Sequence, residues 1–152
     1  MIKDIIDLFL ISISPLGEAK VAIPIAISKN TLSTDIILLV GLLGNLLVFP
    51  LFYKVIEISN YYLLNNKLYR KGAIKLSLRA RKKTKNIIGK FGVWGLMVFV
   101  MIPLPFTGAY IGTIASYIFG INYKKSLFAI SIGIFISCVT IAYGSEYIIE
   151  FI

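Results

Sequence analysis

The sequence has no histidine, a single cysteine and only seven acidic residues among 152. The absence of histidine removes the commonest metal ligand and the usual proton shuttle at neutral pH, so we expect neither a metal centre nor a cofactor. Cys138 is alone and has no partner for an intrachain disulfide. Without a histidine, a second acid inside an apolar block or a serine–base pair, the chain offers no set of groups for an intramembrane enzyme.

Charge is also missing from three long stretches. Residues 36–53 and 126–145 are uncharged runs of 18 and 20 residues, and residues 91–123 form an uncharged run of 33. The apolar content of 58% and the mean hydropathy of +0.87 are too high for a soluble domain. An apolar helix of about 20 residues crosses the hydrocarbon core of a bilayer. We therefore expect an all-α, multi-pass integral membrane protein.

The positive charge is concentrated in one segment. The net charge is +9, and ten of the 16 basic residues lie between Lys67 and Lys90, where there is no acid. A basic block between apolar spans is retained on the cytoplasmic side, so we place residues 57–90 in the cytoplasm and expect no nucleic-acid partner. Its apolar residues recur at spacings of three, four or seven, which predicts a basic amphipathic helix on an anionic membrane surface. This stripe consists of Tyr69, Ala73, Leu76, Ala80, Ile87 and Phe91.

Two apolar blocks are interrupted by helix-breaking residues. Proline removes a backbone donor, and glycine permits backbone angles that other residues resist. The second block, residues 91–123, is too long for one span and too short for two spans with a turn. We therefore predict that residues 5–28 and 91–123 are re-entrant helical hairpins whose tips meet at the working site. The predicted breaks are Pro15, Gly17 and Pro24 in the first block and Pro103, Pro105 and Gly112 in the second.

Each predicted hairpin is followed by one full span, at residues 35–56 and 126–149. The alternative is that both blocks cross the membrane fully, which moves Lys124 and Lys125 to the outside. The positive-inside rule favours the re-entrant version, in which the basic linker and Lys124–Lys125 share the cytoplasmic side and the two halves have opposite orientations. Inverted repeats with broken helices are typical of secondary transporters. The predicted organisation is a single membrane domain, 1–152, made of a first repeat at 1–56, a basic linker helix at 57–90 and a second repeat at 91–152.

Four residues at the tips are candidates for chemistry. Glu18 is the only acid inside an apolar block away from its ends, and removal from water favours its protonated form. Lys20, two residues on, lies on the same side in an extended segment. Thr107 offers a hydroxyl at the second tip, and Gly108 offers a backbone N–H near the start of a half-helix. The alternatives are a structural Glu18–Lys20 ion pair at the first tip and a purely conformational break at the second.

Asn45, in the middle of the first full span, is the fifth candidate. Its amide is suited to a functional polar group or to a hydrogen bond between helices. Helix–helix bonding is the preferred interpretation.

Two motifs resemble those of a known family. Gly17-Glu-Ala-Lys-Val-Ala-Ile-Pro24 and Ile102-Pro-Leu-Pro-Phe-Thr-Gly-Ala-Tyr-Ile-Gly112 resemble the signatures of the small multi-drug export protein family, which is similar in layout to the DedA and SNARE-associated membrane proteins. The resemblance implies a prokaryotic inner-membrane transporter driven by the proton gradient. The residues that it carries over are Glu18, Lys20 and Pro24 at the first motif and Pro103, Pro105, Thr107, Gly108 and Gly112 at the second.

The expected function is therefore proton-coupled export of small molecules through the two tips, with Glu18 as the coupling acid. One alternative is a lipid flippase or scramblase of DedA type, in which Lys20 meets the headgroup phosphate. Another is a structural or assembly factor in which the tips only pack. The expected partners are the lipid bilayer, protons, a small-molecule or lipid substrate and a second copy of the chain, because four membrane elements are few for a closed pathway.

Overall fold

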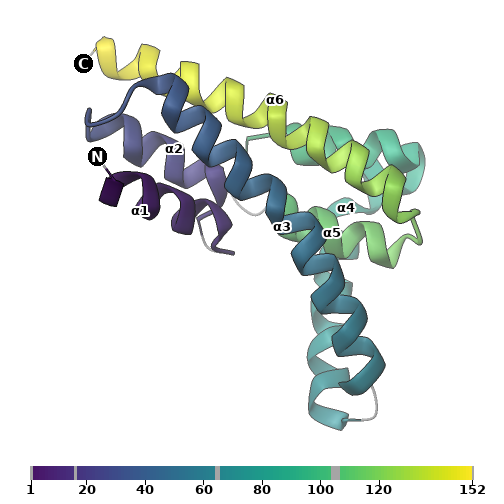
Figure 1. Ribbon diagram of the computed structural model, residues 1–152. Coiled ribbons are helices and arrows are strands. Elements are labelled where there is room, and N and C mark those ends of the chain that lie inside the picture. Colours follow the sequence, from purple (N-terminus) through teal and green to yellow (C-terminus); the bar gives the residue numbers. More distant parts are fainter. Residues whose placement is uncertain (1, 16, 64–65, 104–106, 152) are drawn as a thin grey trace.

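The computed structural model describes residues 2–15, 17–63, 66–103 and 107–151. All regular structure in these ranges is helical, which confirms the predicted all-α class (Figure 1). The helices are α1 (Ile2–Ile13), α2 (Glu18–Ser28), α3 (Thr34–Leu63), α4 (Lys67–Met101), α5 (Ala109–Ile118) and α6 (Tyr123–Glu150).

The two longest apolar helices, α3 and α6, lie antiparallel (Figure 1). The Thr34 hydroxyl at the start of α3 donates to Glu146 Oε1 near the end of α6, over 2.8 Å. At the other end, the Tyr123 ring lies 5.3 Å from that of Phe49 and 5.0 Å from that of Tyr53, measured between centroids. By length and composition, Thr34–Tyr62 and Tyr123–Ile148 can each cross a membrane. The first segment contains the expected span 35–56, and the second contains the expected span 126–149 except for its last residue.

Helices α3 and α6 each follow a part of the chain in which the helical structure is interrupted. Helices α1 and α2 have 12 and 11 residues and are joined by a connection that contains Pro15 and Gly17. Helix α4 changes direction at Gly92, whose φ of 55° is in the left-handed region that glycine adopts without strain. A break that includes Pro103 separates α4 from the ten-residue α5. Pro105, also predicted to break the chain, lies outside the described residues.

Two predicted breaks are wrong. Pro24 lies inside α2, which continues for four more residues because losing the one bond to the Lys20 carbonyl does not end the helix. Gly112 lies inside α5 and serves close packing: a Cβ added there would be 2.8 Å from Val100 Cγ2 of α4. Its small size brings two helices together and does not interrupt either.

Residues 57–90 form parts of two helices, whereas the sequence suggested one linker helix. Residues 51–63 contain neither glycine nor proline, so nothing ends α3 before Leu63, and α4 starts at Lys67. Figure 1 shows the end of α3 and the start of α4 side by side, projecting from the helix bundle; we call residues 57–63 and 67–90 the arm. The expected boundary at 56/57 thus lies inside α3, and that at 90/91 lies inside α4.

The buried face of α4 also differs from the predicted stripe. Ala80, Thr84 and Ile88 are buried at four-residue spacing, whereas Leu76 and Phe91 are 44% and 64% exposed. Thr84 is tolerated there because its hydroxyl donates to the Ala80 carbonyl, over 2.8 Å. The sequence alone did not identify this face, because more than one apolar stripe of the helix is compatible with the positions of the basic residues.

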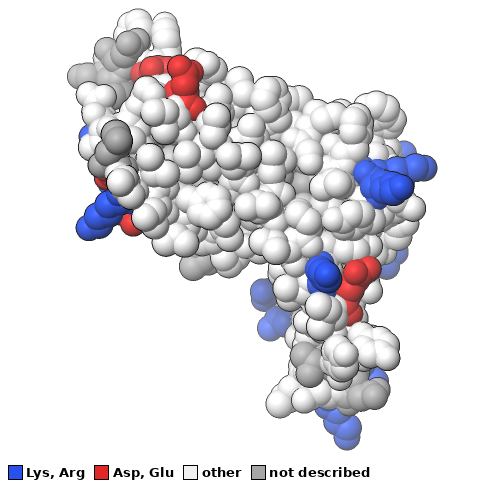
Figure 2. All heavy atoms as spheres, in the orientation of Figure 1, with Lys and Arg blue, Asp and Glu red and all other residues white. Residues whose placement is uncertain are grey.

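The surface is apolar between two charged ends. Figure 2 shows acidic side chains near the end where both termini lie and at the root of the arm, and basic ones where α6 begins and along the arm. The face between them is uncharged in this view. Large apolar side chains of α3 and α6 are exposed on the outside, among them Leu39, Leu43, Leu47, Phe128 and Phe135. Such a belt is what a helical protein presents to lipid.

Candidate functional site

The first turn of α2 faces the break between α4 and α5. Lys20 Nζ donates to the Ile102 carbonyl over 2.9 Å and to Thr107 Oγ1 over 3.0 Å, and it lies 3.4 Å from the Val100 carbonyl. Thr107 Oγ1 in turn donates to the Ile102 carbonyl over 2.9 Å. The last carbonyls of a helix attract cations, so Lys20 holds the C-terminal end of α4.

Glu18 lies at the beginning of α5. Its side chain is only 8% exposed, and Oε1 accepts a hydrogen bond from the Tyr110 backbone N–H over 3.4 Å. Gly108 precedes α5, and a Cβ added to it would coincide with the Glu18 carboxylate. The first N–H groups of a helix attract anions. The acid and the base of one hairpin thus contact the two helix ends at the break of the other.

The backbone of Glu18 is held in an unfavourable conformation. Its φ is 51°, in the left-handed region that residues with a Cβ rarely adopt. Such strain persists only where the surrounding contacts enforce it, and it is common at functional sites. One such contact comes from Tyr110, whose hydroxyl donates to the Ile13 carbonyl and whose ring lies 4.9 Å from that of Phe52.

A cavity of about 310 Å³ adjoins this contact. Glu18 and Lys20 are the charged residues that line it, and apolar and aromatic side chains supply most of the remaining wall. The full lining is Pro15, Gly17, Glu18, Lys20, Val21, Phe52, Leu76, Tyr110, Ile111 and Ile114. We call it the tip cavity. Its volume and its few converging polar groups are typical of small-molecule sites.

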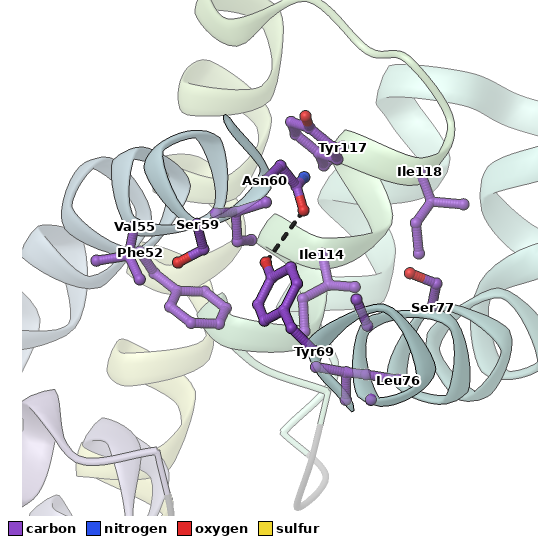
Figure 3. A pocket seen from close by; sticks show the side chains of 13 residues that line it. Phe52, Val55, Ser59, Asn60, Tyr69, Leu76, Ser77, Ile114, Tyr117 and Ile118 are labelled. Atoms are coloured by element: carbon purple, nitrogen blue, oxygen red, sulfur yellow. Dashed lines mark hydrogen bonds between the residues drawn. The ribbon is translucent and has the colours of Figure 1, made fainter. Parts of the chain in front are cut away.

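A second cavity, of about 380 Å³, lies between the arm and α5 (Figure 3). Its walls are mainly apolar and aromatic, and Tyr69 donates a hydrogen bond to Asn60 Oδ1 across it, over 3.1 Å. Phe52, Leu76 and Ile114 line both cavities. The tip cavity and this arm cavity are therefore neighbours separated by three apolar side chains.

The structure brings together four of the five candidates from the sequence: Glu18, Lys20, Thr107 and Gly108. Their assignment to substrate or proton binding stays a prediction. Asn45 is elsewhere, 1% exposed on α3 and next to Cys138 of α6. Within the part of the chain that the structure describes, its Oδ1 accepts no hydrogen bond and it does not line the tip cavity. This position agrees with a contact between helices.

Three contributors were not selected from the sequence. Tyr110 lies within the second motif, two residues after Gly108, where a backbone N–H at the start of a helix has no partner inside that helix. That position was a usable signal. Phe52 and Leu76 carry no such signal, because only packing brings α3 and the arm next to α5.

The fold and the site define a class: a helical membrane protein in which an acid and a base on one short-helix hairpin contact the helix ends at the break of another. Residues 18–140 match the family model described as "Putative small multi-drug export protein". The chain belongs to this family, whose description is that of export proteins and not of enzymes. The comparisons with curated proteins and with solved structures found no match.

Proposed function

We propose that the protein exports small molecules in exchange for protons, through the tip cavity. One observation carries the proposal: the buried Glu18 carboxylate lines a cavity of ligand size and at the same time lies on the N-terminal end of α5. A group in that position links its own charge to the packing of the two hairpins. The family description supports the export of small molecules.

The proposed coupling follows from the charge of Glu18. The ionised carboxylate is attracted to the N-terminal end of α5 and to Lys20, which holds the α1–α2 hairpin against the α4–α5 break. Protonation from outside removes that charge and weakens the contact, so the tips separate and the tip cavity releases its ligand to the outside. Loss of the proton to the cytoplasm restores the contact, and the tip cavity takes up the next ligand from the cytoplasm, so that proton and ligand move in opposite directions. Each cycle moves one proton through Glu18.

The proposed arrangement in the membrane rests on helix length. Helices of 10 to 12 residues extend about 15–18 Å, roughly half of the ~30 Å hydrocarbon core. We therefore propose that α1–α2 and the α4–α5 break are re-entrant, and that each pairs with the following long helix as one of two inverted repeats. The antiparallel packing of α3 and α6 supports this. The arm and Lys124–Lys125 then lie in the cytoplasm of a prokaryotic cell.

The lipid-transport alternative has less support. In that scheme the Lys20 ammonium meets a headgroup phosphate, but its bonds to the Ile102 carbonyl and Thr107 direct it toward the end of α4. The tip cavity is also small for a whole phospholipid. In the assembly-factor alternative the tips only pack. The experiment below distinguishes this alternative from transport.

We propose a homodimer as the functional unit, since four membrane elements are few for a closed pathway.

The experiment is efflux from proteoliposomes under an imposed pH gradient, with the native chain compared with Glu18→Gln. The probes are ethidium and a panel of neutral and anionic fluorescent aromatic compounds, and an internal pH dye follows proton movement. We expect gradient-driven efflux of at least one probe by the native chain and loss of both efflux and proton movement in Glu18→Gln. Glu57→Gln, an acid at the root of the arm, is the matched control and should transport normally. Equal transport by native chain and Glu18→Gln would refute the coupling role.

A further inference from the structure

A third cavity, of about 410 Å³, lies on the lipid-facing side of the molecule, between α4 and α6. It is away from the tips: the residues that line it are Val93, Trp94, Met97, Lys124, Lys125, Phe128 and Ala129. None of these residues was assigned to the export site. Its composition is divided, with two lysines at one end and apolar side chains in the rest.

The two parts of this cavity are separated along the helices. Lys124 and Lys125 are in the first turn of α6, and Phe128 and Ala129 lie one turn further, about 4.5–6 Å along the axis. The facing part of α4 runs in the same direction. Val93 and Trp94 line this cavity with the start of α6, and further along α4 the Met97 carbonyl would be 2.8 Å from a Cβ added to Gly133 of α6. The lysines therefore mark the outer end of the cavity, and the apolar floor continues toward the middle of the molecule.

The exposure of the floor shows which solvent it faces. Trp94 of α4 is 66% exposed, and Phe128, which belongs to the apolar belt, is 59% exposed. Tryptophan is enriched where a membrane protein passes from hydrocarbon to headgroups, since its ring is apolar and its N–H is polar. A lysine pair next to an exposed tryptophan is therefore at headgroup depth, with the apolar floor at the depth of acyl chains.

The charge at this end is not balanced by nearby acids in the sequence. Residues 58–145 contain no Asp or Glu, and none of the residues that line the cavity is acidic. Glu57 lines a different cavity, together with Lys54 and Tyr123. Figure 2 shows basic side chains gathered over the end of the molecule where α6 begins. A ligand that complements this cavity carries a negative charge above an apolar chain.

We propose that this cavity binds one anionic phospholipid, with its phosphate on Lys124 and Lys125 and an acyl chain on Trp94, Met97 and Phe128. A free phosphate uses only the lysines and leaves the apolar floor uncovered, whereas a neutral lipid uses only the floor. The anionic lipid matches both parts. This binding does not depend on the proposed export, because it requires only that the protein lies in a bilayer.

The chain contains one tryptophan, and it lines this cavity, which permits a direct test. The protein is reconstituted in phosphatidylcholine with increasing fractions of lipid that carries brominated acyl chains, which quench tryptophan on contact. Excitation is at wavelengths where only tryptophan absorbs. Brominated phosphatidylglycerol is compared with brominated phosphatidylcholine of the same chains. One lysine at the surface of an anionic membrane contributes about 1 kcal/mol, so a preference of about fivefold or more for the anionic lipid is expected.

Two charge-matched variants give the control. Lys124→Gln with Lys125→Gln should bring the preference to within about twofold of unity, whereas Lys71→Gln with Lys75→Gln on the arm should leave it at the native value. Lys124→Arg with Lys125→Arg keeps the charge and should keep the preference. Retained quenching by brominated phosphatidylcholine shows that a variant is folded with Trp94 toward lipid.

Four results would overturn the proposal. One is equal quenching of the native chain by both lipids, which indicates non-selective lipid contact. The second is an unchanged preference in the variant that lacks Lys124 and Lys125. The third is an equal loss in the arm variant, which indicates general surface charge. Inorganic phosphate that abolishes the preference, when chloride of the same ionic strength does not, would show a free-anion site instead.

Discussion

Gly108→Ala tests the contact on which the proposed site depends. The φ of Gly108 is −88°, which alanine adopts without strain, so the backbone does not require glycine here. The added methyl group, however, would occupy the position of the Glu18 carboxylate. The carboxylate must move away and lose both the Tyr110 N–H and its place at the start of α5.

The size of the effect follows from these two losses. A hydrogen bond to a charged group contributes about 1.5–3 kcal/mol, and a charge at a helix end contributes about 0.3–1 kcal/mol. We expect the free energy of unfolding to fall by about 2–4 kcal/mol. For a chain of this length that lowers Tm by about 4–16 °C. The measurement is thermal unfolding of the purified protein in detergent, followed by circular dichroism.

A double-mutant cycle isolates the contact. In a Glu18→Ala background there is no carboxylate to displace, so Gly108→Ala should cost little, and the coupling energy should be close to the full cost in the native chain. Gly72→Ala is the control: a Cβ there meets nothing within 4 Å, so alanine should raise stability by about 0.5–1 kcal/mol. If Gly108→Ala costs the same with and without the Glu18 carboxylate, the two groups are not in contact and the proposed coupling fails.

Two further substitutions test the packing around the tips. Gly112→Ala should lower the free energy of unfolding by about 1–3 kcal/mol in the same assay, because its Cβ meets the stiff Val100 side chain. Val100→Ala should relieve that cost. Simple additivity of the two changes would contradict the close approach. Lys20→Met should lower the free energy of unfolding by about 1–3 kcal/mol, because the Ile102 carbonyl loses a donor. Lys82→Met, on the exposed side of α4, should change it by no more than about 0.5 kcal/mol. Equal effects would show that Lys20 does not hold the helix end.

Much of the architecture follows from local features of the sequence. The long uncharged runs predicted α3 and α6, because a run of about 20 apolar residues has few alternatives to a spanning helix. Pro15, Gly17 and Pro103 lie outside the helices as expected, since they act on the backbone of their own turn. Glu18 was selected for the same local reason: it is an acid inside an apolar block.

The same residue types were misleading where tertiary contacts decide the outcome. Pro24 lies within α2, and Gly112 serves the approach of α5 to Val100 of α4. Neither residue differs in type from those that do break the chain. Whether a proline or a glycine ends a helix depends on the packing that compensates for it, and that packing comes from other parts of the chain.

The sequence by itself determined that this is a helical membrane protein with two broken blocks and an acid in the first. Only the tertiary structure decided what the acid contacts. Glu18 and Gly108 are separated by 90 positions, and they meet because α2 packs beside the start of α5. The bond from Lys20 to the end of α4 is formed in the same way. No local pattern encodes these contacts, because each depends on how whole helices pack against one another.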